Sequence, residues 1–105
     1  MKKTDPFYKS RRWKIVRSAV LRRDGYRCQW SKRYGKRVKA ETVHHAFPRS
    51  EFPEYSWEPW NLISLSADVH DHMHDRVTGA LTDSGRTLMR IVARRAGVEV
   101  PERYR

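Results

Sequence analysis

Apolar residues recur at helical spacing in two segments of the chain, one near each end. In the segment 13–24 they occupy one face of a helix: Trp13, Val16, Val20 and Leu21. In the segment 84–96 the equivalent stripe is formed by Leu88, Ile91 and Val92. Gly25 and Gly97 follow these segments directly, where a left-handed C-terminal cap favours glycine. We therefore predict two amphipathic helices, with Trp13 as a core residue.

Between these helices the pattern changes to short apolar runs that are typical of β-strands. Residues 37–47 and 61–65 each carry such a run and predict two strands. The segment 48–60 contains three prolines and little periodicity, so it predicts a long loop of the kind that is often functional. Ser66 is a favourable N-cap for a helix over 67–78, which Gly79 would end.

The remaining segments are polar and set the expected domain boundaries. We expect a basic arm over residues 1–12, one domain over 13–97 and a tail over 98–105. Residues 26–40 predict a basic connection with a turn at 34–36. Strand, loop, strand and helix, flanked by a helix on each side, predict an α+β fold.

Composition narrows the possible partners and surroundings. The 105 residues include 23 Lys and Arg against 12 Asp and Glu, a net charge of +11 that suits a polyanion such as nucleic acid. Cys28 is the only cysteine, so the chain cannot form an internal disulfide and fits a reducing, intracellular setting. Neither a transmembrane run nor a signal peptide is predicted, and we expect no membrane partner.

All five histidines lie between positions 44 and 74, and two of them are spaced to share a helix face. His70 and His74 are four residues apart on the expected helix, so both can reach one metal ion. His72 points roughly 200° away from His70 on that helix and is left out of the site. A solvated helix face can carry such a pair by accident, so the spacing alone is a weak indication.

His44 and His45 are adjacent in the first expected strand. Neighbouring side chains of a strand point to opposite faces, so one histidine can bind a metal while the other acts elsewhere. Histidine titrates near neutral pH and can accept a proton from water. The plainer interpretation is one core histidine and one surface histidine.

Taken in order, three motif pieces resemble the HNH endonuclease family, whose core is the ββα-metal motif. They are Val43-His44-His45, the run 61–65 that begins at Asn61, and the His70 and His74 pair. The segment 13–27 is similar to the helix that precedes the motif in many phage and bacterial members. The resemblance covers roughly residues 12–78 and implies an α+β ββα-metal core with flanking N-terminal and C-terminal helices.

The resemblance also implies roles for five residues. His44, His70 and His74 match the metal ligands, although many relatives have Asp at the first position. His45 matches the general base that activates water, and Asn61 matches the asparagine that braces the ββ loop and helps to orient that base. The expected reaction is metal-dependent hydrolysis of DNA phosphodiester bonds with a single divalent ion, giving 5′ phosphate and 3′ hydroxyl ends.

Many relatives also hold a structural zinc with two CxxC pairs, which this sequence lacks. The first pair would be Cys28 with position 31, and the second positions 66 and 69, which here are Ser31, Ser66 and Val69. One thiolate cannot complete a four-ligand site, so we expect no structural zinc and a buried Cys28. The last helix and three tryptophans are candidates for a core that compensates: Trp30, Trp57 and Trp60.

The working metal and the DNA contacts are less well defined by the sequence. Mg, Mn, Ni and Zn are all candidate ions, because three imidazoles suit the later transition metals and relatives differ. On charge alone, six arginines are candidates for DNA contacts: Arg22, Arg23, Arg49, Arg76, Arg94 and Arg95. The short chain looks most like phage members, for which a role in DNA packaging beside a terminase in the bacterial host cytoplasm is expected by analogy.

Two other functions fit parts of the same pattern. A non-catalytic nucleic-acid-binding module could use the histidines to hold a structural zinc, whose removal would unfold it. A basic ribosomal or RNA-associated protein would prefer RNA and would tolerate replacement of His45. The adjacent histidines argue against both, because a purely structural site has no use for a second poised imidazole.

Overall fold

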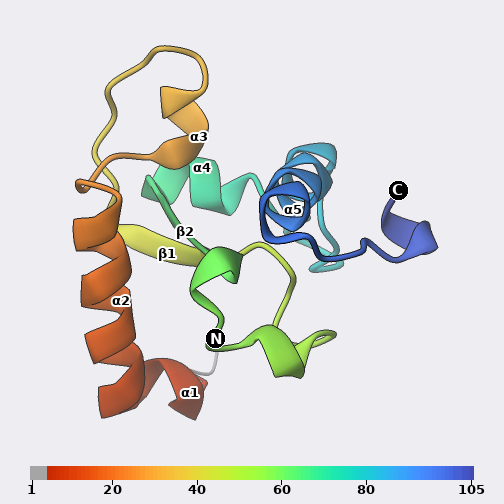
Figure 1. The fold of residues 1–105 in the computed structure, drawn as a ribbon, viewed down its shortest axis with the longest axis horizontal. Coiled ribbons are helices and arrows are strands. Elements are labelled where there is room, and N and C mark those ends of the chain that lie inside the picture. The colour runs from red at the N-terminus through yellow and green to blue at the C-terminus, as the bar shows by residue number, and fades with distance from the viewer. Residues whose placement is uncertain (1–4) are drawn as a thin grey trace.

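A computed structural model describes residues 5–105. The major elements are helix α2 (Arg11–Arg23), strands β1 (Thr42–His45) and β2 (Leu62–Leu65), and helices α4 (Ala67–Asp71) and α5 (Asp83–Ala96). Short helices precede and separate them: α1 (Pro6–Lys9), α3 (Gln29–Lys32), and the 3₁₀ turns η1 (Pro53–Tyr55), η2 (Pro59–Asn61) and η3 (Glu102–Tyr104). Figure 1 shows the two strands in the middle, with α2 on one side and α5 on the other.

The two strands form an antiparallel pair that separates two hydrophobic clusters. His44 pairs with Ile63 and His45 with Leu62. Because side chains alternate along a strand, Leu62 packs with Val20 on the α2 side, while Ile63 packs on the opposite side with the cluster that includes α5. Both expected strands are confirmed, although β1 is limited to four residues.

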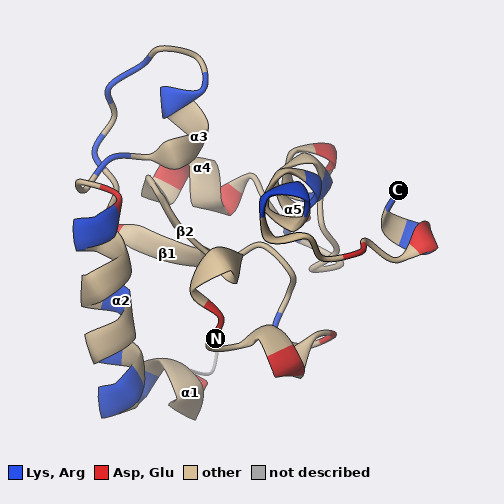
Figure 2. Ribbon diagram, in the orientation of Figure 1, with Lys and Arg blue, Asp and Glu red and all other residues tan. Residues whose placement is uncertain are grey.

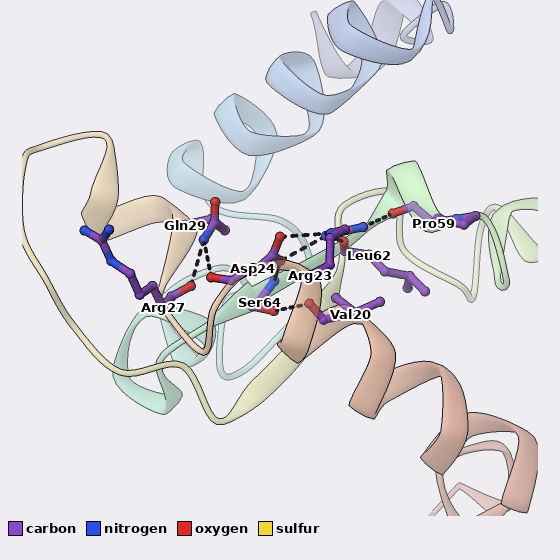
Figure 3. Close-up of polar contacts among 8 residues, drawn as sticks. All are labelled: Val20, Arg23, Asp24, Arg27, Gln29, Pro59, Leu62 and Ser64. Carbon is purple, nitrogen blue, oxygen red and sulfur yellow. Dashed lines mark hydrogen bonds and ion pairs between the residues drawn. The ribbon is translucent and has the colours of Figure 1, made fainter.

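The C-terminal end of α2 is tied to β2 by polar side chains (Figure 3). Asp24 accepts a hydrogen bond from the Ser64 amide at 3.1 Å. The Arg23 guanidinium donates to the carbonyl oxygens of Pro59 (2.9 Å) and Leu62 (2.6 Å), and it pairs with Asp24. Arg23 therefore holds the helix against the sheet, and its role as a DNA contact stays a prediction.

The helix expected over 67–78 is much shorter in the structure, and this is a correction to the sequence prediction. Ser66 caps α4 as expected, but the helix ends at Asp71. Met73 is fully buried, and its carbonyl accepts a hydrogen bond from the Thr82 amide, so the chain turns back there. His74 consequently lies in a bridge with Leu81 and not on the helix. Non-local packing overrides the local helical pattern.

The second amphipathic helix is confirmed, with its C-terminal cap. Gly97 has φ of 72°, a left-handed conformation that glycine adopts without steric cost. Leu88 and Val92 are buried as expected, and Ile91 is half-buried. The expected tail at 98–105 is not detached, because Val98, Val100 and Tyr104 pack against the same cluster.

The expected basic arm at 1–12 also differs from the structure. Residues 1–4 lie outside the described residues, and Pro6–Lys9 form α1. Residues 11 and 12, the end of the expected arm, form the start of α2. Phe7 of α1 packs against Trp13 and Trp57, with ring centroids 5.4 and 4.6 Å away. This segment is therefore part of the folded domain from Asp5 onward.

Cys28 is fully buried, as expected, beside two of the serines that replace cysteines of the family pattern. The Ser31 hydroxyl donates to the Cys28 Sγ at 3.4 Å. Burial alone would raise the pKa of this thiol, but hydrogen bonds with Ser31 and then Ser66 outweigh it and lower the pKa. Of the candidates for a compensating core, α5, Trp30 and Trp60 belong to the same hydrophobic cluster as Cys28, whereas Trp57 packs in the other cluster.

No helix among residues 5–105 has the length and apolar composition needed to cross a bilayer.

Candidate active site

A cleft of about 520 Å³ lies where α1 and α2 meet β1 and the loop after it. Its lining combines histidines, aromatic rings and charged side chains: Asp5, Tyr8, Trp13, Arg17, Thr42, Val43, His44, His45, Pro48, Arg49, Ser50, His70 and His74. Four of the five histidines therefore open onto one hollow. Figure 2 shows that α2, which forms one wall, also carries many of the basic residues.

His44 faces His70 and His74, although these two come from a helix and a bridge. The His44 ring centroid lies 5.2 Å from that of His70 and 5.4 Å from that of His74, and the last two are 6.5 Å apart. Two imidazoles bound tetrahedrally to one ion at ligand distances place their centroids about 5 Å apart. The distances from His44 to the other two rings are therefore close to those of imidazoles that share one ion.

The Nε2 atom of His44 is the most informative atom of this group. It is buried and has no hydrogen-bond partner among residues 5–105. Burying a polar atom without a hydrogen-bond partner costs free energy. Such an atom is therefore a candidate to bind a ligand. No three side chains of the described residues already form a closed metal site, so the rings would have to rotate to converge on an ion.

Burial favours the neutral, metal-binding form of His44 and His74. Desolvation lowers the pKa of His44 well below its usual 6.5, and the neighbouring charges of His70, His74 and His45 lower it further. Desolvation also lowers the pKa of His74. A neutral imidazole has a free lone pair, which a metal ion requires.

His45 points to the other face of the strand, toward α2. Its ring stacks on Trp13 with centroids 5.3 Å apart and planes 20° from parallel. Its Nε2 lies 3.0 Å from the Ser56 carbonyl oxygen, which can only accept a hydrogen bond. The proton is therefore assigned to Nε2, so Nδ1 carries the lone pair. Nδ1 lies 3.5 Å from the Tyr8 hydroxyl.

Electrostatics also favour a neutral His45. Desolvation lowers its pKa, and the nearby charges of Arg49 and His70 act in the same direction, while the hydrogen bond with Ser56 opposes them. A neutral ring with a fixed tautomer can accept a proton at Nδ1.

Asn61 is fully buried and closes the long loop between the strands. Its Oδ1 accepts from the Phe47 amide at 2.6 Å, and its Nδ2 donates to the carbonyls of Phe47 (3.1 Å) and Tyr55 (3.2 Å). Asn61 thereby fixes the segment that carries Ser56, whose carbonyl contacts His45. It is a positioning residue and does not itself line the cleft.

Comparison with solved structures finds a similar protein. The crystal structure of the HNH endonuclease of deep-sea thermophilic bacteriophage GVE2, solved with a manganese ion, is similar at 35% identity and a TM-score of 0.61. The match covers 63% of this chain and 72% of the phage protein. The chain belongs to the HNH endonuclease family. No family model and no curated protein matches the sequence.

Membership of the HNH family confirms the predicted fold class. The antiparallel β1–β2 pair followed by α4 is an α+β arrangement consistent with the ββα-metal fold. The HNH histidines His44, His45, His70 and His74 line one cleft, whereas His72 is exposed and its Nδ1 contacts the Asp68 carbonyl. The metal and base roles of these side chains stay predictions.

The six arginines that were predicted to contact DNA, on the basis of charge, differ in whether they line the cleft. Arg49 lines the HNH cleft. The other five are exposed and do not line it: Arg22, Arg23, Arg76, Arg94 and Arg95. Proximity to the histidines therefore favours Arg49, and the exposed arginines stay predictions on charge alone.

Among the residues that line the cleft, the sequence analysis missed three with ionisable side chains: Asp5, Tyr8 and Arg17. Asp5 and Tyr8 fell in the segment interpreted as an arm, and Arg17 lies on the polar side of α2. One available signal was the Asp5-Pro6 pair, because aspartate as N-cap followed by proline at N1 is typical of a helix start.

Proposed function

We propose that this protein is a metal-dependent DNA endonuclease in which His44, His70 and His74 hold one divalent ion and His45 is the general base. The observation that supports it most directly is the buried, unpartnered Nε2 of His44, whose ring lies 5.2 and 5.4 Å from two further imidazole rings. The manganese in the phage relative is consistent with a divalent ion in this family. Mg, Mn, Ni and Zn are the ions to test.

The residues present fit such an ion. Three neutral imidazoles supply nitrogen donors and leave other coordination positions for water and phosphate oxygens. When bound, the ion would polarise the scissile phosphate and neutralise charge on the leaving 3′ oxygen. His44, His70 and His74 line the same cleft as His45, so a phosphate held at the ion would lie in the hollow that the base also lines.

His45 would accept a proton from the attacking water at Nδ1. Its Nε2–H stays on the Ser56 carbonyl and Trp13 stacks on the ring, so the base keeps one orientation. The water oxygen would form a bond to phosphorus as the bond from phosphorus to the 3′ oxygen breaks. The products would carry a 5′ phosphate and a 3′ hydroxyl, as the family implies.

Charge supports DNA as the substrate. The net charge of +11 favours a polyanion, and basic residues lie along α2 beside the cleft (Figure 2). We extend the proposal to a role in phage DNA packaging, with a terminase as partner, on the support that the relative comes from a bacteriophage. A non-catalytic binding module with a structural zinc is the alternative to be tested.

The test is cleavage of supercoiled plasmid with Mg, Mn, Ni or Zn and with EDTA. We expect wild type to cleave with at least one ion and to stop in EDTA. His45→Ala should lose about 10²- to 10⁴-fold in rate, the contribution expected of a general base. His72→Ala is the matched control, since His72 is exposed and outside the cleft, and it should cleave like wild type.

Two results would contradict the proposal. Equal cleavage by wild type and His45→Ala would mean that the base is assigned to the wrong residue or that a contaminant cuts. Tight DNA binding without cleavage under any condition would favour the binding module.

A further inference from the structure

Arg49 is held on the edge of the cleft by three residues of the N-terminal segment. Its guanidinium forms an ion pair with the Asp5 carboxylate. The guanidinium carbon also lies 4.1 Å from the Phe7 ring centroid and 5.5 Å from that of Tyr8. Asp5, Tyr8 and Arg49 all line the cleft that contains His45. The segment that begins at Asp5 therefore controls where this arginine points.

The contact with Asp5 leaves Arg49 incompletely satisfied. The pair is formed through one terminal nitrogen of the guanidinium. The Nε atom of Arg49 is buried and has no hydrogen-bond partner among residues 5–105. A guanidinium can bind a phosphate through two parallel hydrogen bonds, which a single carboxylate oxygen does not provide.

We propose that the Asp5 carboxylate occupies the place of a DNA phosphate on Arg49, so that the substrate must displace it. This inference rests on the proposed function, because it takes the cleft as the DNA site. Asp5 and a backbone phosphate are both anions that the same guanidinium binds. The N-terminal segment thus lowers the affinity for DNA by an amount set by the Asp5–Arg49 pair.

The position offers a substitution that changes this pair and little else. Asp5 is the N-cap of α1, and its Oδ1 accepts from the Phe7 amide at 2.9 Å. Asparagine caps helices about as well as aspartate, so Asp5→Asn keeps the cap and removes the charge. Asp83→Asn is the matched control, because Asp83 is an exposed carboxylate that pairs with Arg86 outside the cleft.

The test is a double-substitution cycle read by DNA binding. Binding of a short labelled duplex is measured by fluorescence anisotropy with EDTA and again with manganese, for wild type, Asp5→Asn, Arg49→Gln and the double variant. We expect Asp5→Asn to tighten binding by about two- to five-fold, the range of an exposed ion pair, and Asp83→Asn to tighten it less. In the Arg49→Gln background, Asp5→Asn should have no more effect than the control.

Equal tightening by Asp5→Asn and Asp83→Asn, or equal tightening by Asp5→Asn with and without Arg49, would overturn the proposal, because the effect would then be net charge alone. Circular dichroism checks folding, and Arg49→Met replaces Arg49→Gln if the latter does not fold, since its stem can still pack on Phe7. Cleavage is followed separately on the same samples. Coupling without cleavage would leave this inference standing and count against the proposed function alone.

Discussion

Two regions of this molecule bury polar side chains, and they differ in how those side chains are satisfied. Around Cys28, the Ser31 hydroxyl bonds to the sulfur, and Ser66 also hydrogen-bonds to it. Around His44, the Nε2 atom is buried without a partner among residues 5–105, while the rings of His70 and His74 lie 5.2 and 5.4 Å away.

The difference separates a structural region from one built for a ligand. Burying a polar atom costs free energy unless a hydrogen bond compensates. Near Cys28 the protein supplies that bond itself, and α5 covers the region with apolar side chains. Near His44 the described residues supply no such bond to Nε2, so the free-energy cost of burying that atom remains until a ligand binds it. The first region is therefore structural packing, and the unpartnered atom of the second supports the proposed metal site.

The largest effect on stability is expected from Asn61→Ala, at the loop beside the cleft. The substitution would leave the Phe47 amide and the carbonyls of Phe47 and Tyr55 without a partner. We expect the free energy of unfolding to fall by about 3 kcal/mol, measured by urea denaturation. Ser56→Ala in the same loop removes one hydrogen bond, to Pro53, and should cost about 1 kcal/mol.

A similar loss from both variants would contradict the bracing role of Asn61. It would mean that the loop of the cleft is held mainly by its aromatic packing.

Gly85→Ala should disturb the cleft through Met73 and Leu81, the residues that neighbour His74. A Cβ at this position would lie 2.4 Å from the Met73 carbonyl oxygen and 2.9 Å from the Leu81 Cδ2. Relief of this clash would displace the segment that holds His74, at a cost of about 2 kcal/mol. We expect weaker manganese binding by calorimetry, whereas Ser84→Ala, the neighbouring control, should bind normally. Unchanged manganese binding by Gly85→Ala would show that the position of His74 does not depend on the packing around Gly85.

The stability of the metal-free protein should depend on pH through the buried imidazoles. The pKa values of His44, His45 and His74 are lowered in the folded state relative to the ordinary histidine pKa of 6.5. Below pH 6.5 the unfolded chain therefore binds more protons than the folded protein does. The free energy of unfolding should therefore be greatest above pH 6.5 and fall as the pH decreases below it. Denaturation in EDTA from pH 7.5 to about 5 measures this slope.

His44→Asn should reduce that slope. A slope equal to that of wild type would show that the pKa of His44 is not lowered by burial in the folded protein, and it would contradict the contrast between the two regions.

The smallest effect is expected at Cys28. Cys28→Ala removes a buried sulfur and its contact with Ser31, and should cost about 1 kcal/mol in the free energy of unfolding. Metal content, measured by atomic absorption, should not change, because this region satisfies its own polar groups. Loss of a bound ion in this variant would mean that the region around Cys28, and not only the region around His44, contributes to metal binding.

Much of the fold could be predicted from local pattern, and the failures have physical reasons. The long helices α2 and α5 carry enough residues for a periodic apolar face and have clear caps. The four-residue helices α1 and α3 are too short for such a pattern and were missed. The end of α4 at Asp71 depends on the burial of Met73 and its bond with Thr82, which local sequence does not encode.

The site shows the same division. His44 and His45 face opposite sides of β1 because strands alternate, so their separation was predictable. His70 and His74 were expected on one helix, yet His74 reaches the cleft from a bridge with Leu81. The motif spacing thus selected histidines that the structure brings to one cleft, although the helix expected to carry His74 was wrong.

Manganese titration of the metal-free protein tests the central claim most directly. Calorimetry should give one ion per chain for wild type. His44→Ala, His70→Ala and His74→Ala should each abolish or strongly weaken binding, while His45→Ala and His72→Ala should bind one ion as wild type does. Retention of a full site after loss of His44, or its loss in His72→Ala, would contradict the account.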